Sequence, residues 1–344
     1  MNKEGNPEII GASARSVIPT DGIERILFVR LSALGDCISS MPVLCALRRR
    51  FPKAHIAWLI QDNSLPIIQN LKMIDEVIVF PRARWREQPP FRVNWREAYR
   101  LVRHLRMRRF DLVVDVQSNS KSSVLSWLSG AKYHIGHGKG QSKEISHWFI
   151  KTPVAPDPNQ THIIPRSLKL LEPLGVKVET PEFSLPKDDA ANTRMTKWLE
   201  RKKLAPKSYC LLAPFCSTTE KEWPPMRYSK LAGLLANNGT PVVALNAPGR
   251  EETVKQIVKD AQSPQVFAGP STSIVEMVEL VRMAKGAVGG DTGPMQIAGA
   301  LGVPSIAFFG PTDPNRTGPW GLDAALDMQV EEGPAFDAIT KAMR

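Results

Sequence analysis

The sequence has few of the patterns that mark secreted, membrane-spanning or metal-binding proteins. Its 344 residues include only four cysteines, and Cys37, Cys45, Cys210 and Cys216 form no CxxC pair and no cluster with histidines at metal-ligand spacing. Disulfide and zinc sites are therefore disfavoured, and all four thiols are expected to be buried and inert. No apolar run approaches the roughly 18 residues that a membrane-spanning helix needs.

Other motifs are missing as well. No GxGxxG fingerprint, no convincing DxD-type metal signature and no RRM, KH, zinc-finger or helix-turn-helix pattern occurs. Residues 1–23 contain acidic side chains and no continuous apolar core, so they resemble a flexible leader rather than a signal peptide. These absences favour a cytoplasmic protein that needs no cofactor or metal and binds no nucleic acid, and we expect it to be a monomer.

What the sequence does have is an excess of positive charge. The formal net charge is +11, and ten arginines face only two glutamates between residues 82 and 109. Such a segment suits nucleic acid, anionic phospholipid or a phosphorylated substrate, while a solvated helix face is the ordinary alternative.

The order of apolar runs predicts two similar halves. Buried strands are expected at 25–31, 55–60, 76–80 and 111–116, with helices after the first and around 119–129. A second alternating series begins near Tyr209 and continues to the strand at 305–310. The pattern predicts an α/β protein with two Rossmann-like domains, at 24–180 and 187–325, facing an interdomain cleft, and a C-terminal tail or helix at 326–344.

Three loops after predicted strands carry polar residues that suit chemistry. Asp36 precedes a helix and is equally compatible with an N-cap or a general base. Ser217, Thr218 and Lys221 offer hydroxyls and a point charge for phosphate. Asp291-Thr292-Gly293-Pro294 begins another helix, whose free N–H groups favour an anion.

These loops resemble glycosyltransferase family nine, the ADP-heptose:lipopolysaccharide heptosyltransferases. The resemblance lies in VRLSALGD, the KxWP element at 221–224, PGxxE at 248–252 and, above all, DTGPM with the following ALGVP and FGPTDP at 291–314. It covers residues 24 to about 322. It implies a GT-B fold and an inverting, metal-independent transfer of heptose from ADP-heptose to the lipopolysaccharide inner core, with Kdo–lipid A or heptose as the acceptor.

The resemblance also implies roles for individual residues. Asp36 would be the general base. Lys221, Thr292 and Gly293 would hold the diphosphate and sugar, together with the hydroxyls of Ser217 and Thr218, and Asp291 would hold the sugar hydroxyls. Glu252, or its neighbour Glu251, would bind the ribose. Gln296 stands where the family usually has histidine, which leaves the identity of the transferred sugar open.

On the acceptor side, QSNSKSS and IGHGKGQSKE resemble family elements and place Lys121 and Lys143 near anionic groups of a glycolipid. The arginine-rich segment would then meet the anionic inner leaflet, with the protein peripheral to the cytoplasmic face of the inner membrane. Alternatives are a related enzyme with another nucleotide sugar or acceptor, a nucleotide-sugar epimerase, and a non-catalytic basic binding protein. An epimerase would need a second acid/base pair, which the sequence does not show.

Overall fold

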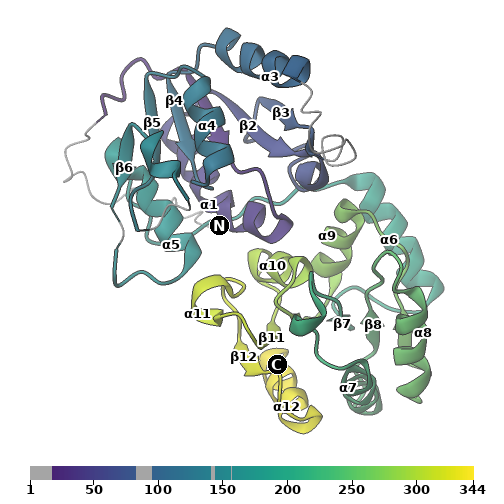
Figure 1. Cartoon of the computed structure of the whole chain (residues 1–344). Helices are drawn as coiled ribbons and strands as arrows, with labels where there is room; N and C mark the ends of the chain where they lie inside the picture. The colour runs from purple at the N-terminus through teal and green to yellow at the C-terminus, as the bar shows by residue number, and fades with distance from the viewer. Residues whose placement is uncertain (1–17, 83–94, 141–143, 156) are drawn as a thin grey trace, which may run out of the picture.

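The computed structural model describes residues 18–82, 95–140, 144–155 and 157–344, and these form two lobes of α/β structure (Figure 1). The elements of the first lobe are β1 (Arg25–Val29), α1 (Leu34–Arg50), β2 (His55–Gln61), η1 (Asp62–Ile67), β3 (Glu76–Phe80), α3 (Trp95–Met107), β4 (Leu112–Asp115), α4 (Ser120–Leu128), β5 (Tyr133–His137), η2 (Ser146–Trp148), β6 (Thr152–Val154), α5 (Ile163–Leu168) and η3 (Lys169–Leu174).

The second lobe repeats this alternation. Its elements are α6 (Asp189–Arg201), β7 (Cys210–Ala213), η4 (Thr219–Lys221), α7 (Pro225–Asn237), β8 (Val242–Ala244), α8 (Glu251–Asp260), β9 (Val266–Ala268), α9 (Ile274–Met283), β10 (Gly286–Gly290), α10 (Gly293–Ala300), β11 (Ser305–Phe309), α11 (Pro314–Thr317), β12 (Ala324–Asp327) and α12 (Glu332–Ala342). The described residues contain no helix long and apolar enough to cross a membrane.

Each lobe is built on a six-stranded parallel sheet with the same strand order. The orders are β3-β2-β1-β4-β5-β6 and β12-β11-β10-β7-β8-β9. Every residue of β4, β7, β8, β10 and β11 is buried, which explains why these strands are continuous apolar runs in the sequence. In both sheets the strand order reverses beside the first strand, between β1 and β4 and between β7 and β10. Loops that leave the carboxyl ends of strands at such a point are where doubly wound sheets bind ligands.

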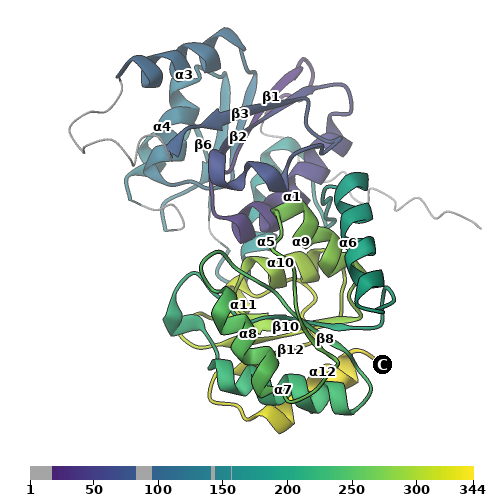
Figure 2. The same ribbon diagram turned by 90° about the vertical axis from the view of Figure 1, so that its right-hand side faces the viewer.

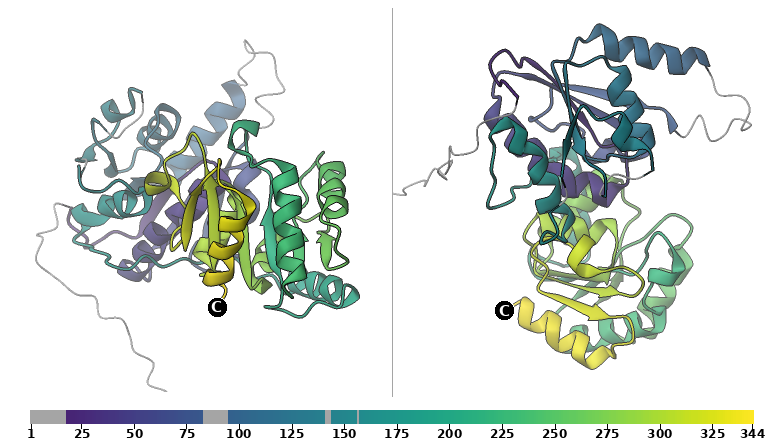
Figure 3. Two further views of the ribbon diagram at one scale, coloured as in Figure 1. Left: turned by 90° about the horizontal axis from the view of Figure 1, so that it is seen from below. Right: turned by 60° about the vertical axis from the view of Figure 1, so that its left-hand side comes forward.

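Helix α1 joins the two lobes. It lies between the sheets together with α5, α9 and α10 (Figure 2), and every residue from Cys37 to Leu47 is buried. A helix buried on all sides must be apolar all round, which is why α1 shows little amphipathic pattern. At its N-terminus Leu34 packs so closely on Gly293 that a Cβ added to the glycine would lie 2.8 Å from the leucine methyl group. The far end of the second lobe is covered by α12, the yellow helix in Figure 3.

Several elements were not predicted. Helix α6 precedes the alternating series that was expected to begin near Tyr209, yet its buried Ala191, Met195, Trp198 and Leu199 follow helical spacing and pack against α9. β5 and β6 were missed because YHIGH and TPV are too polar or too short to suggest strands. In the segment expected to be a leader, residues 1–17 lie outside the described range, while Ile18 and Ile23 are buried.

Candidate functional site

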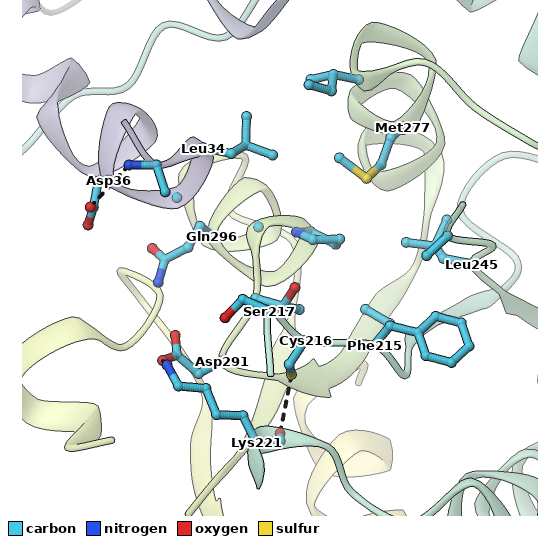
Figure 4. A pocket seen from close by; sticks show the side chains of 18 of the residues that line it. Leu34, Asp36, Phe215, Cys216, Ser217, Lys221, Leu245, Met277, Asp291 and Gln296 are labelled. Carbon is cyan, nitrogen blue, oxygen red and sulfur yellow. Dashed lines mark hydrogen bonds and ion pairs between the residues drawn. The ribbon is translucent and has the colours of Figure 1, made fainter. Parts of the chain in front are cut away.

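The loops after β1, β7, β8 and β10 meet around a cavity of about 680 Å³ between the lobes. Figure 4 shows Leu34 and Asp36 on α1 at one side, Lys221 and Asp291 at another, and the apolar Phe215, Leu245 and Met277 at a third. The cavity thus has one acidic corner, one mixed ionic corner and one apolar wall. These are the features needed to hold a molecule that has a reactive group, an anionic group and a flat apolar ring.

Asp36 forms the acidic corner. The structure places it as the third residue of α1, behind Ala33 as the N-cap, so the prediction that it might be an N-cap is wrong. Its Oδ2 lies 2.5 Å from Nη2 of Arg30 and accepts the Ala33 N–H at 3.3 Å. Arg30 is 8% exposed at the side chain, whereas the Asp36 side chain is 43% exposed. A buried guanidinium therefore fixes one oxygen of a carboxylate that remains accessible from the cavity.

Lys221 and Asp291 form the ionic corner. Lys221 Nζ lies 3.0 Å from Asp291 Oδ2, and both side chains are largely shielded from solvent. Asp291 directly follows β10, and Thr292 is the N-cap of α10, without a hydrogen bond from its side chain. The N-cap of this helix is therefore Thr292 and not Asp291. In the first turn of α10, Pro294 has no N–H and Met295 donates its N–H to the Thr292 carbonyl at 3.1 Å. The Gly293 N–H and the helix dipole therefore favour an anion there, beside the Lys221 ammonium group.

Gln296 lies in the wall between Asp36 and the ionic corner and is 7% exposed. Its Nε2 donates to the Thr317 carbonyl at 2.7 Å, and its Oε1 accepts from Ser39 Oγ on α1 at 3.5 Å. The amide thus connects α10 in the second lobe with α1 in the first.

The remaining predicted donor residues divide into two groups. Ser217 and Gly293 line the cavity with Lys221, Asp291 and Thr292. Thr218 and Glu252 do not line it: Thr218 is exposed, and Glu252 lies on the outside of α8, 86% exposed, with Lys255 at 2.6 Å. Glu251 instead accepts the Gly249 N–H at 3.3 Å.

Cys216 also differs from expectation. It is half-buried rather than buried, lines the cavity and donates to the Lys221 carbonyl at 3.2 Å. Burial raises the pKa of its thiol to about 12, so it remains unreactive as predicted. The other three cysteines are buried.

The acceptor-side predictions fare differently. Lys121 is exposed on α4 and lines neither this cavity nor its neighbour, and Lys143 lies outside the described residues. A second cavity of about 420 Å³ adjoins the first and shares Asp36, Ile163, Thr312 and Thr317 with it. Its basic side chains are Arg30, Arg166 and Arg316.

Sequence reasoning missed all three of these arginines. Arg30 lies inside the VRLSALGD motif and Arg316 lies two residues after FGPTDP, so a signal was present for both. Nothing in the local sequence distinguishes Arg166, because its significance depends on contacts between distant segments. The described residues contain no group of three or more His, Cys, Asp or Glu side chains arranged to hold a metal ion.

Comparison with known proteins gives a consistent result. The family model for glycosyltransferase family 9 (heptosyltransferase) matches residues 98–340. The lipopolysaccharide core heptosyltransferase OpsX of Haemophilus influenzae is 24% identical over 318 residues, covering 91% of this chain and 86% of that protein.

Two solved structures share the architecture. A family 9 glycosyltransferase from Veillonella parvula has a TM-score of 0.80 at 21% identity, covering 93% of this chain and 97% of that one. The heptosyltransferase WaaC of E. coli, solved with ADP, has a TM-score of 0.77 at 23% identity, covering 92% and 99%. The predicted GT-B fold is confirmed.

Proposed function

Because the chain belongs to glycosyltransferase family 9, we propose that it transfers heptose from ADP-heptose to the inner core of lipopolysaccharide. The chain is thus a glycosyltransferase, and the donor and acceptor are the proposal. Support comes from the relative OpsX, a lipopolysaccharide core heptosyltransferase, and from WaaC, which was solved with ADP. The proposed acceptor is Kdo–lipid A or a heptose already attached to it.

One observation carries the proposal. A carboxylate and a positively charged site that suits an anion face the same cavity, each from the point where the strand order of one sheet reverses. Glycosyl transfer needs a base for the attacking hydroxyl and a positive environment for the departing diphosphate. Asp36 supplies the first, and Lys221 with the first turn of α10 supplies the second. The apolar wall at Phe215, Leu245 and Met277 suits the nucleobase.

In this mechanism the acceptor hydroxyl transfers its proton to Asp36 as its oxygen bonds to the anomeric carbon. The bond from that carbon to the diphosphate breaks, and its electron pair leaves on the β-phosphate. Attack from the face opposite the leaving group inverts the anomeric centre. Both described contacts of Asp36 engage Oδ2, so Oδ1 is the oxygen that takes the proton.

The leaving group is stabilised without a metal ion in this proposal. Lys221 has three donor hydrogens, of which Asp291 uses one, so the ammonium can bind the diphosphate as well. The Gly293 N–H and the dipole of α10 add stabilisation that costs no reorganisation during the reaction. Asp291 is then placed to accept hydrogen bonds from the sugar hydroxyls, with Thr292, Gly293 and Ser217 beside it. Glu252 or Glu251 would reach the ribose only after the α8 N-terminus moves.

A membrane-facing surface suits a lipid-linked acceptor. On α3 the outward side chains Trp95, Tyr99 and Met107 are 77%, 68% and 69% exposed. The arginines between them, Arg96, Arg100 and Arg103, form no ion pair within the described part of the chain. Interfacial helices combine aromatic and basic residues in this way. We therefore place the protein at the cytoplasmic face of the inner membrane, acting as a peripheral monomer.

A transfer assay tests the function. Purified protein would be incubated with Kdo–lipid A as the acceptor and with one donor at a time: ADP-heptose, a UDP-linked sugar or a GDP-linked sugar. The masses of the lipid products would be measured by mass spectrometry. We expect one added heptose from ADP-heptose alone. Transfer from a UDP or GDP donor in preference, or no transfer to any lipopolysaccharide core acceptor, would overturn the assignment.

A further inference from the structure

We propose that the second cavity binds a carboxylate or phosphate group of the acceptor between Arg166 and Arg316. The inference rests on the proposed function, since the cavity adjoins the one that holds Asp36. Arg166 comes from α5 in the first lobe and Arg316 from α11 in the second. An anion held between them would therefore contact both lobes.

The two guanidinium groups lack acidic partners. Neither side chain forms an ion pair or hydrogen bond with any residue that the structure describes. Both guanidinium groups line the same cavity, where burial and the positive charge of Arg316 lower the pKa of Arg166. Two unpaired positive charges facing one cavity favour an anionic ligand, because arginine binds carboxylate and phosphate through parallel N–H donors.

The carboxylates around the cavity are already engaged elsewhere. Asp36 is paired with the third arginine, Arg30, at 2.5 Å. Asp313 caps α11, where its Oδ1 accepts the Asn315 N–H at 2.9 Å. Three guanidinium groups against two carboxylates leave the lining positive.

The walls of the cavity are held in place by buried contacts. Asp115 is fully buried and accepts the backbone N–H groups of Gln117 and Ser118 at 3.2 and 2.8 Å, which fixes the loop along one wall. Across the cavity, His162 Nε2 lies 3.0 Å from the Gly318 carbonyl and ties the start of α5 to the segment after Arg316.

A hydroxyl group adds a neutral donor. Thr312 lines both cavities, and its Oγ1 is buried without a partner in the described structure. A buried hydroxyl left unpaired costs free energy, which a bound anion would recover. Because Asp36 and Thr312 are common to both cavities, the anion would lie beside the attacking hydroxyl. The acceptor is its source because the donor diphosphate has its own site at Lys221.

The test separates the acceptor from the donor. Arg166→Gln and Arg316→Gln remove one positive charge each, and Arg201→Gln, on an exposed arginine of α6 that lines neither cavity, is the matched control. Calorimetric titrations would use ADP and the deacylated, water-soluble Kdo acceptor, and steady-state kinetics would give both KM values. The same titrations with an acceptor whose carboxyl is reduced to an alcohol complete a cycle in which the arginine and the carboxyl are removed singly and together.

We expect each cavity variant to weaken acceptor binding roughly 10- to 100-fold, the range of a charge-assisted hydrogen bond, with ADP affinity within about twofold. If the carboxylate is the bound group, the carboxyl-reduced acceptor should bind the wild type and the variants alike. If a phosphate is the bound group, the variants should weaken binding of the carboxyl-reduced acceptor as they weaken binding of the intact one. Weaker ADP binding with unchanged acceptor binding would assign the arginines to the donor diphosphate and overturn the proposal, as would no change in either titration.

Failure of the proposed function would look different. If the wild type binds ADP but not the Kdo acceptor, that acceptor is wrong, and thermal stabilisation by inorganic phosphate with ADP present tests the cavity itself. Loss of that stabilisation in both cavity variants, but not in Arg201→Gln, supports the anion site. If inorganic phosphate stabilises both cavity variants as much as the wild type, the proposed anion site is refuted.

Discussion

Replacing Asp36 by asparagine separates its catalytic role from its structural one. The amide keeps the shape of the side chain and can still accept the Ala33 N–H, which Asp36 accepts at 3.3 Å. It cannot take a proton from the acceptor hydroxyl. If Asp36 is the base, turnover should fall by roughly 10²- to 10⁴-fold, the usual contribution of a positioned base.

The structure adds a stability cost to this change. Arg30 is 8% exposed and loses the carboxylate that lies 2.5 Å from it. Because the Asp36 side chain is 43% exposed, solvent screens the pair, and we expect a loss on the order of 1 kcal/mol in the free energy of unfolding. Such a loss leaves a typical domain of this kind folded.

The assay is steady-state turnover at saturating ADP-heptose and acceptor, together with ADP affinity by calorimetry and thermal unfolding. Asp188→Asn is the matched control, since Asp188 caps α6 through the Ala191 N–H at 2.7 Å and asparagine caps equally well. ADP affinity should be unchanged in both variants. Turnover of Asp36→Asn within about threefold of the wild type would refute the base assignment.

Three further predictions concern the metal, the membrane and pH. Turnover should stay within about twofold in excess chelator, because Lys221 and α10 bind the diphosphate; strict dependence on restored magnesium or manganese would contradict this. Sedimentation with anionic vesicles should weaken by roughly fivefold for each of Arg100→Gln and Arg103→Gln. Equal binding to neutral vesicles, or tighter binding to RNA, would contradict the membrane surface. Burial raises the pKa of Asp115 from 3.8 to about 6. Its contribution to stability is therefore full below pH 3.8 and lost as the pH rises through 6. The unfolding free energy of the wild type relative to Asp115→Asn, from urea denaturation at pH 4 to 7, should fall by on the order of 3 kcal/mol. A constant difference would show that Asp115 is not shifted.

The fold was largely predictable because both sheets are buried on both faces. After their first residues, runs such as RILFV in β1 and SIAFF in β11 are apolar throughout, so the strands and their parallel pairing could be predicted from the sequence. Helix α6 was missed, although its apolar spacing was present in the sequence. The proposed domain boundaries remain predictions.

Site residues could be predicted only where they lie in loops that follow predicted strands. Asp36, Lys221 and Asp291 each follow a strand, and their loops meet because the carboxyl ends of parallel strands share one edge of a sheet. Arg30 and Asp36 pair within one short segment, but the meeting of Arg166 with Arg316 depends on tertiary packing. No local pattern encodes such contacts.

The most direct test of the central claim is a crystal structure of Asp36→Asn with ADP-heptose bound. The account predicts that the β-phosphate lies within hydrogen-bond distance of Lys221 Nζ and the first turn of α10. The adenine ring should lie against Phe215 and Met277, and the heptose should lie between the diphosphate and position 36. A diphosphate bound between Arg166 and Arg316, or a heptose pointing away from position 36, would contradict it.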